Sequence, residues 1–211
     1  MIGVVFTEES ILKLREAVKI RLSEKRFSHT LGVERCAEKL GNLILPERIN
    51  ELRAAALLHD ISKEIPFEVQ FEILKRNDFP LTEEDKATLG VIHSFTAPYV
   101  VSENFPDFAT RDILSAVYNH TLGCEDMSIF DKIIFVSDYV EETRKFESCI
   151  AVRKLLFNGI ESLNASDRII RLDEAVLAAL NGALEALGRM GQPINSRIYI
   201  TKKYLESNKL Q

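Results

Sequence analysis

The 211-residue chain contains no tryptophan, few cysteines and no long hydrophobic run. Its three cysteines, Cys36, Cys124 and Cys149, are widely spaced and form no C-x-x-C pair, which argues against a disulfide framework and a thiolate zinc site. No stretch approaches the ~18 consecutive apolar residues of a membrane span, and residues 1–9 lack the pattern of a signal peptide. We therefore expect a cytoplasmic protein with reduced thiols and no membrane partner.

The chain also lacks an extended basic run, and its net charge is −5. Both features argue against a nucleic acid as the partner, because neutralising a phosphate backbone requires many lysines and arginines. A single nucleotide needs only a small local cluster of cations, so a nucleotide ligand stays open. With 46% hydrophobic residues the chain can bury one sizeable core, and we expect a single domain.

Apolar residues recur at helical spacing along most of the chain, and no alternating strand pattern is longer than a few residues. Thr82 and Ser128, each followed three residues later by aspartate, resemble capping boxes, and Pro98 is expected to kink its helix. The predicted fold class is all-α, a single-domain bundle of about nine or ten helices with no significant sheet. The predicted helices are 8–22, 28–40, 47–60, 66–74, 82–100, 110–121, 128–141, 146–163, 172–189 and 195–208.

One pair of residues, His59 and Asp60, lies at the end of an apolar, alanine-rich run. On a helical period His59 shares a face with Leu52 and Ala55 and so points to the core, while Asp60 is turned by about 100° from it. A carboxylate among apolar neighbours is costly to bury unless a cation or a metal ion pairs with it. The pair therefore predicts partners elsewhere in the chain.

Potential partners are few, because the chain has only four histidines. A lone histidine on an apolar face is more often a hydrogen-bonded core residue than a metal ligand. These four histidines, however, follow one another at intervals that each suit one helix and one connection, and Asp138 follows the last of them at such an interval as well. Nitrogen and carboxylate ligands without cysteine favour iron, manganese or zinc, with an open site favouring iron or manganese. The candidate ligands are His29, His59, Asp60, His93, His120 and Asp138.

Four strings carry a family resemblance: residues 26–33 (RFSHTLGV), 57–63 (LLHDISK), 120–123 (HTLG) and 132–141 (KIIFVSDYVE). In this order they resemble the HD-domain phosphohydrolases and, among these, the YqeK-like symmetrical bis(5'-nucleosyl)-tetraphosphatases. The resemblance extends from about residue 14 to 205. It departs from the family pattern at Ser94, Leu122 and Glu142, where glycine, threonine and proline are usual, and this leaves nearby substrate contacts less defined.

The resemblance implies one HD domain over residues 1–211. Residues 1–25 would form a docking helix, 26–145 the metal-ligand core, and 146–211 the C-terminal helices that complete the bundle. It also implies two transition-metal ions, with iron ranked ahead of manganese and zinc. One ion would take His29, His59, Asp60 and Asp138 and the other Asp60, His93 and His120, so that Asp60 bridges them.

The implied reaction is the symmetrical hydrolysis of diadenosine tetraphosphate to two ADP, with a hydroxide between the two metals as nucleophile. Asp60 and Lys63 are the predicted catalytic residues, and Lys63, Arg26, Thr121 and Arg144 the predicted substrate contacts. Lys63 is placed one helical turn beyond Asp60, if that helix continues. The alternative for each cation is a solvated surface charge, and for Thr121 a packing role.

Glu141, one turn after Asp138, is expected to orient a ligand or a metal-bound water rather than to bind metal. Two other functions compete with the tetraphosphatase. One is an HD phosphohydrolase acting on another nucleotide or a phosphomonoester, and the other is a metal-bound nucleotide sensor without turnover. The expected partner is a dinucleoside polyphosphate or nucleotide, and the sequence is also compatible with a homodimer.

Overall fold

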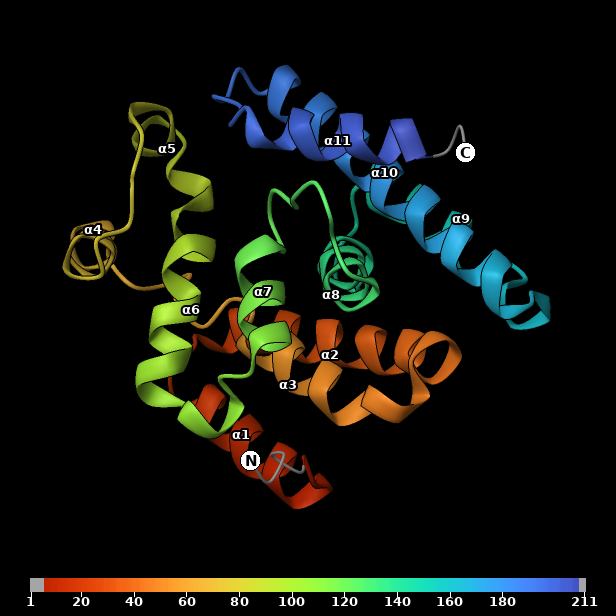
Figure 1. The fold of residues 1–211 in the computed structure, drawn as a ribbon, viewed down its shortest axis with the longest axis horizontal. Helices are drawn as coiled ribbons and strands as arrows, with labels where there is room; N and C mark the ends of the chain where they lie inside the picture. Colours follow the sequence, from red (N-terminus) through yellow and green to blue (C-terminus); the bar gives the residue numbers. More distant parts are fainter. Residues whose placement is uncertain (1–5, 209–211) are drawn as a thin grey trace.

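The computed structural model describes residues 6–208, in which the chain forms eleven α-helices, four short 3-10 helices and no strand (Figure 1). The all-α prediction is confirmed. The α-helices are α1 (Glu8–Lys19), α2 (Glu24–Ile44), α3 (Ile49–Leu58), α4 (Phe67–Arg76), α5 (Glu83–Ala87), α6 (Ile92–Asn104), α7 (Arg111–Asn119), α8 (Ile129–Val140), α9 (Glu147–Phe157), α10 (Ala165–Arg189) and α11 (Arg197–Asn208). The 3-10 helices are η1 (Pro46–Arg48), η2 (Leu89–Val91), η3 (Pro106–Phe108) and η4 (Ile160–Ser162).

Helix α8 is the centre of the bundle, and it packs against α2, α3, α7, α9 and α10. It is seen end-on in Figure 1, with α1 at one end of the view and α10 and α11 at the other. Apolar side chains occupy most positions of α8, including Phe130, Ile133, Ile134 and Val136, which are buried on different sides of it. A helix that is apolar around most of its circumference must be enclosed by its neighbours, and this explains its central place.

The capping boxes predicted at Thr82 and Ser128 are both present. The Thr82 and Ser128 side chains accept hydrogen bonds from the backbone N–H groups of Asp85 and Asp131, whose carboxylates accept from the cap residues in return. These reciprocal bonds satisfy N–H groups that have no partner within the helix. They fix where α5 and α8 begin.

The single helix expected over 82–100 is wrong, because the chain forms α5, η2 and α6 there. Thr88 ends α5: its hydroxyl donates to the Glu84 carbonyl at 2.8 Å and accepts a hydrogen bond from Asn195 at 3.1 Å. A threonine that hydrogen-bonds to the backbone and to a distant side chain competes with helix continuation. His93 therefore lies in the first turn of α6, and Pro98 lies inside that helix.

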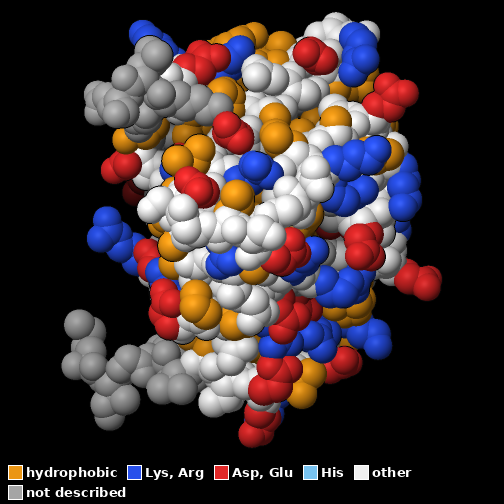
Figure 2. All heavy atoms as spheres, turned by 90° about the vertical axis from the view of Figure 1, so that its right-hand side faces the viewer, with side chains coloured by type: hydrophobic (Ala, Val, Ile, Leu, Met, Phe, Trp, Pro, Cys, Tyr) orange, Lys and Arg blue, Asp and Glu red, His pale blue; other side chains and the backbone are white. Residues whose placement is uncertain are grey.

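The surface carries charges of both signs. Figure 2 shows one face of the molecule, where acidic and basic side chains lie interspersed with single hydrophobic ones. Within residues 6–208 no helix combines the length and the apolar character that a bilayer crossing requires.

Candidate metal centre

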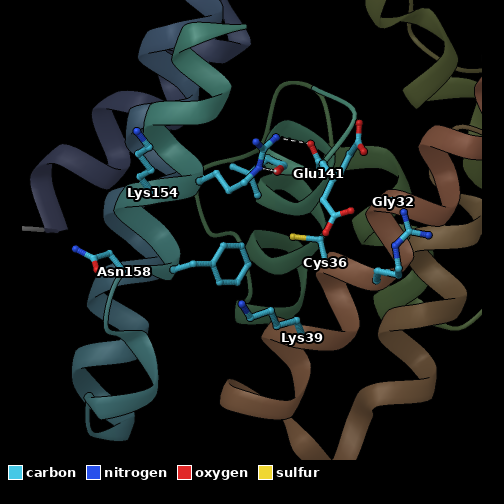
Figure 3. Close-up of a pocket in the computed structure, with 11 residues that line it drawn as sticks. Gly32, Cys36, Lys39, Glu141, Lys154 and Asn158 are labelled. Atoms are coloured by element: carbon cyan, nitrogen blue, oxygen red, sulfur yellow. Dashed lines mark hydrogen bonds between the residues drawn. The ribbon is translucent and has the colours of Figure 1, made fainter. Parts of the chain in front are cut away.

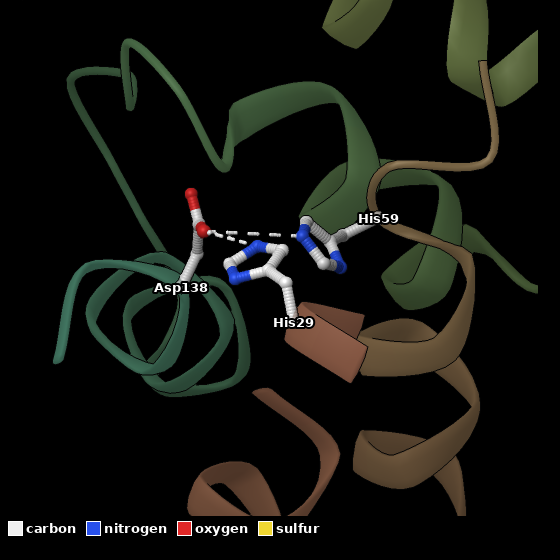
Figure 4. Close-up of side chains that lie close together, drawn as sticks. All are labelled: His29, His59 and Asp138. Atoms are coloured by element: carbon white, nitrogen blue, oxygen red, sulfur yellow. Dashed lines mark ion pairs between the residues drawn. The ribbon is translucent and has the colours of Figure 1, made fainter. Parts of the chain in front are cut away.

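Six side chains from five helical segments meet in the middle of the bundle. His29 lies on α2, His93 on α6 and Asp138 on α8, while His59, Asp60 and His120 directly follow the ends of α3 and α7. All are buried except Asp138, which is partly exposed. They form two groups, His29–His59–Asp138 (Figure 4) and Asp60–His93–His120, within each of which the potential ligand atoms lie within 4.8 Å of one another. The structure thus brings together all six ligands that the sequence predicts.

Asp60 lies between the two groups and faces both. Its Oδ2 atom is 3.4 Å from His59 Nε2 and 3.7 Å from His29 Nε2. Its Oδ1 atom is 3.2 Å from His93 Nε2 and 3.6 Å from His120 Nε2. Each carboxylate oxygen therefore faces a different histidine pair, which is the arrangement that a bridging ligand needs.

Hydrogen bonds fix the orientation of three of the histidine rings. The Nδ1 atoms of His59 and His120 lie 2.7 and 2.8 Å from backbone carbonyls one turn earlier in the chain. A carbonyl only accepts hydrogen bonds, so Nδ1 carries a proton in both rings and Nε2 is the nitrogen left to bind a metal ion. His29 Nδ1 similarly lies 3.0 Å from a carboxylate oxygen of Glu141. The Nε2 atoms of all three rings therefore face the carboxylates of the centre.

The donor atoms fit a metal ion. The Nε2 atoms of His29 and His59 are buried and face carboxylate oxygens, Asp138 Oδ1 at 3.0 Å and Asp60 Oδ2 at 3.4 Å, but neither makes a hydrogen bond of good geometry to the described residues. A buried polar atom without a partner is costly in a folded protein, and coordination would satisfy both atoms. Four imidazoles and two carboxylates, with no thiolate, are a donor set suited to iron, manganese or zinc.

The titration of the centre is dominated by burial and by close charges. Burial lowers the pKa of His29, but the carboxylates of Asp138 and Glu141 beside its ring outweigh burial and raise that pKa to about 9. Burial raises the pKa of Asp60 and Asp138, whereas the imidazoles around Asp60 and the Arg144 guanidinium beside Asp138 hold both pKa values well below their usual range. The carboxylates are therefore ionised and ready to bind a cation.

Two arginines pair with these carboxylates from the solvent side. Arg26 Nη1 is 2.8 Å from Asp60 Oδ2, and Arg144 Nη2 is 2.7 Å from Asp138 Oδ1. Both arginines line a cleft of about 660 Å³ that also holds Lys25, Lys145 and the His29 ring. We call this opening the cationic cleft. It places four cationic side chains at the entrance to the centre, as the binding of a polyphosphate requires.

Lys63 reaches the centre by a different path from the one expected. The helix does not continue, because α3 ends at Leu58, and Lys63 lies in a turn in which its backbone N–H donates to the Asp60 carbonyl at 2.9 Å. Its ammonium lies 3.1 Å from His93 Nδ1 and donates to the Gly90 carbonyl at 3.3 Å. Burial lowers its pKa. Lys63 thus lies beside the candidate ligand His93, but the continued helix expected for it is wrong.

Thr121 is less available than expected. Its hydroxyl donates to the Ser94 hydroxyl at 2.8 Å, and Ser94 donates to the Val91 carbonyl at 2.8 Å. Ser94 stands where the family pattern has glycine, so this hydrogen-bond chain depends on one of the departures of this sequence. Thr121 follows His120 in the chain, but its hydroxyl proton is already donated to Ser94.

Glu141 is held against His29 by a glycine in the opposite helix. A Cβ atom at Gly32 would come within 2.3 Å of Glu141 Oε2, so only glycine lets the carboxylate reach the His29 ring. The Thr143 backbone N–H donates to the same carboxylate at 2.7 Å. Behind Glu141 is a cavity of about 600 Å³ between α2 and α9, and Figure 3 shows Glu141 and Gly32 at its wall.

Arg153 on α9 is a residue that the sequence analysis missed. Its guanidinium donates to the backbone carbonyls of Val140, Glu141 and Arg144, the last at 2.9 Å. It thereby fixes the turn that carries both Glu141 and Arg144 into the centre. No local pattern in the sequence marks such a residue, because its role depends on the packing of α9 against the end of α8.

Comparison with known proteins identifies the relatives of this chain. Two proteins named symmetrical bis(5'-nucleosyl)-tetraphosphatase are similar: one from Bacillus subtilis, 28% identical over 90% of this chain and 94% of that protein, and one from Halalkalibacterium halodurans, 29% identical over 86% and 89%. A crystal structure from Clostridium acetobutylicum, described as a predicted HD superfamily hydrolase involved in NAD metabolism, matches with a TM-score of 0.79 and 26% identity. It covers 93% of this chain and 96% of that one.

The HD domain family model matches residues 26–143, more than half of the chain. All six candidate ligands, from His29 to Asp138, lie within that match. The chain therefore belongs to the HD domain family.

Proposed function

We propose that this protein is a metal-dependent phosphohydrolase that cleaves diadenosine tetraphosphate symmetrically into two ADP. The observation that carries the proposal is the convergence of four histidines and two aspartates with Asp60 facing both groups. The similarity to two proteins named as symmetrical tetraphosphatases over about nine tenths of the chain supports the choice of substrate. The HD domain match and the set of nitrogen and carboxylate donors together support a hydrolase that uses metal ions.

Two metal ions would share Asp60. His29, His59 and Asp138 would complete one site, and His93 and His120 the other, with iron ranked ahead of manganese and zinc. When bound, such ions supply Lewis acidity, which activates water as a nucleophile and neutralises phosphoryl oxygens.

The side chains of the protein position the polyphosphate and neutralise its charge. Arg26 and Arg144 lie in the cationic cleft, where they would exchange part of their contact with Asp60 and Asp138 for contact with phosphate oxygens. Lys63 would donate hydrogen bonds on the side of His93 and His120. Glu141 keeps the Nδ1 proton of His29 in place, so that Nε2 stays directed into the centre.

One alternative substrate class has a specific observation in its favour. Ser94 stands where the family pattern has glycine, and its hydroxyl accepts a hydrogen bond from Thr121, so the polar contacts next to His93 and His120 differ from that pattern. Another nucleotide or a phosphomonoester would then be the substrate. A sensor without turnover is less well supported, because the complete ligand set comes together. A cytoplasmic location, a homodimer and the absence of a nucleic-acid partner stay predictions.

A comparison of substrates tests the proposal. The metal-loaded protein should show its highest kcat/KM with diadenosine tetraphosphate, measured against ATP, ADP and p-nitrophenyl phosphate. Asp138→Asn should abolish this activity, whereas Asp107→Asn, at an exposed aspartate far from the centre, should leave it unchanged. A higher kcat/KM with a phosphomonoester would replace the proposal by the alternative.

A further inference from the structure

A second cavity, of about 600 Å³, lies beside the cationic cleft and plays no part in the chemistry described so far. It lies between the end of α8, the start of α9 and the last turns of α10. Its volume is within the range typical of small-molecule sites, which are mostly apolar with a few polar groups. Its apolar walls are formed by Tyr139, Phe146, Ala183, Ala186, Leu187 and Met190. We call it the apolar cavity.

The apolar cavity adjoins the cationic cleft, because Arg144 and Phe146 line both. Arg144 also contacts Asp138 in the metal centre at 2.7 Å. A ligand that leaves the apolar cavity past Arg144 therefore enters the cleft beside the centre. An apolar chamber followed by a cationic channel matches a nucleoside phosphate, whose base is flat and uncharged and whose phosphates are anionic.

Two large apolar side chains at this cavity are exposed without a structural reason. Phe146 is 71% exposed and Met190 63% exposed. Phe146 is also the N-cap of α9 and makes no side-chain capping hydrogen bond, whereas serine, threonine, aspartate or asparagine usually occupies that position. Neither packing nor capping explains a phenylalanine here. An aromatic ring with a free face is a stacking surface for a base.

The opposite wall of the cavity is held in place. Tyr139 donates a hydrogen bond through its hydroxyl to Ser148 at 3.0 Å. A Cβ atom at Gly182 would lie 2.2 Å from that hydroxyl, so glycine allows the tyrosine to pack directly against α10. The fixed tyrosine and the exposed phenylalanine give the cavity one rigid wall and one open aromatic face.

We propose that the apolar cavity binds the purine base of a nucleoside phosphate, stacked on Phe146, with its phosphates running past Arg144 into the cationic cleft. The substrate class rests on the proposed function. The inference adds the site of the nucleoside and makes Phe146 a specificity-determining residue for a reaction that occurs elsewhere in the protein.

Equilibrium binding to the metal-loaded protein separates the contribution of the base to affinity from that of the phosphates. ADP should bind more tightly than pyrophosphate, which carries the same phosphate chemistry without a base. Phe146→Ala should weaken ADP binding by roughly 5- to 100-fold, the range expected for loss of stacking on one base, and leave pyrophosphate binding unchanged. Phe67→Ala, at a phenylalanine that is 42% exposed on α4, is the matched control and should change neither.

A fluorescence experiment reports the contact directly, because the chain has no tryptophan. In Phe146→Trp the new indole should be quenched by ADP and unaffected by pyrophosphate. The indole of Phe67→Trp should respond to neither. Equal quenching of both variants by ADP, or unchanged ADP affinity in Phe146→Ala, would overturn the proposal.

These outcomes are separate from the proposed function. If the wild-type protein left diadenosine tetraphosphate intact but ADP binding depended on Phe146, the base site would stand and the proposed reaction would fall. If the tetraphosphate were cleaved and ADP bound no better than pyrophosphate, the base site alone would be wrong.

Discussion

Asp60 is the residue on which the two halves of the centre depend, because its two oxygens face different histidine pairs. Asp60→Ala should therefore lose both metal ions, whereas His120→Ala should lose mainly one. Elemental analysis of each purified variant measures this directly, with Asp107→Ala as an exposed control that keeps both ions. The bridging role is contradicted if the two variants lose the same single equivalent.

Lys63 has an ammonium within 3.3 Å of the His93 ring but no carboxylate partner at salt-bridge distance among the described residues. As a phosphate contact it should act on charge that develops during the transfer. Lys63→Ala is expected to lower kcat/KM on the order of 10² to 10³ without removing metal, the usual cost of losing one electrostatic donor. Lys75→Ala, at an exposed position of α4, should have no effect.

Wild-type turnover in a Lys63→Ala protein that keeps its metal would remove this residue from the mechanism. Phosphate neutralisation would then depend on Arg26 and Arg144, which lie in the cationic cleft.

At the scale of single residues, the cluster of candidate ligands could be predicted from the sequence because few residue types bind metal and the chain has only four histidines. The neighbours of these ligands were harder to place. Lys63 was expected on a continued helix and instead lies in a turn, and the Thr121–Ser94 hydrogen bond joins residues 27 positions apart. Such contacts depend on how helices pack, which periodicity does not reveal.

At the scale of elements, the turn between α8 and α9 contains two residues, Glu141 and Arg144, whose side chains contact candidate metal ligands. Arg153 donates to three carbonyls in residues 140–144, which include Glu141 beside His29 and Arg144 beside Asp138. Loss of the Arg153 guanidinium should therefore weaken both the Glu141–His29 contact and the Arg144–Asp138 contact. Arg153→Ala is expected to weaken metal binding by roughly 10- to 100-fold, the cost typical of losing a partner behind a metal ligand.

Titration of each variant with metal in a calorimeter measures this change in metal affinity. Lys154→Ala is the control, because Lys154 is the next residue on α9 and its side chain is exposed. Unchanged metal affinity and unchanged turnover in Arg153→Ala would show that the turn holds its shape without the guanidinium.

Helix boundaries could be predicted where the signal is local and not where it is distant. The capping boxes at Thr82 and Ser128 are local, and both were identified. The break between α5 and α6 was missed because Thr88 is fixed by Asn195, more than one hundred residues later in the chain. Helix α10 is an exception, because it was predicted to begin at 172 and begins at Ala165, although its cap, Asn164, is a local signal.

At the scale of the whole molecule, metal ions should contribute to stability. Without them, Asp60 and Asp138 are neutralised only by Arg26, Arg144 and the imidazoles, and the buried Nε2 atoms of His29 and His59 make no hydrogen bond of good geometry to the described residues. Ions that bind only the folded state stabilise it by RT ln(1 + [L]/Kd), or about 2.7 kcal/mol at one hundred times Kd. The melting temperature should therefore rise with free metal concentration.

Differential scanning calorimetry of chelated and metal-loaded protein checks this. Identical melting temperatures at all metal concentrations would mean that the six residues do not bind metal in the folded protein.

The sequence predicted the all-α class and the meeting of the six ligands, but it gave no sign of the cavities. The apolar cavity is formed by α8, α9 and α10, whose exposed side chains Phe146 and Met190 look like ordinary surface residues in the sequence. A cavity is a property of the space between elements. It can be located only after their packing is known.

The products of diadenosine tetraphosphate hydrolysis test the central claim most directly. Anion-exchange chromatography after complete reaction with the metal-loaded protein should give ADP as the only nucleotide, two molecules for each substrate molecule consumed. Equal amounts of ATP and AMP, or intact substrate in the presence of protein that carries its metal, would contradict the account.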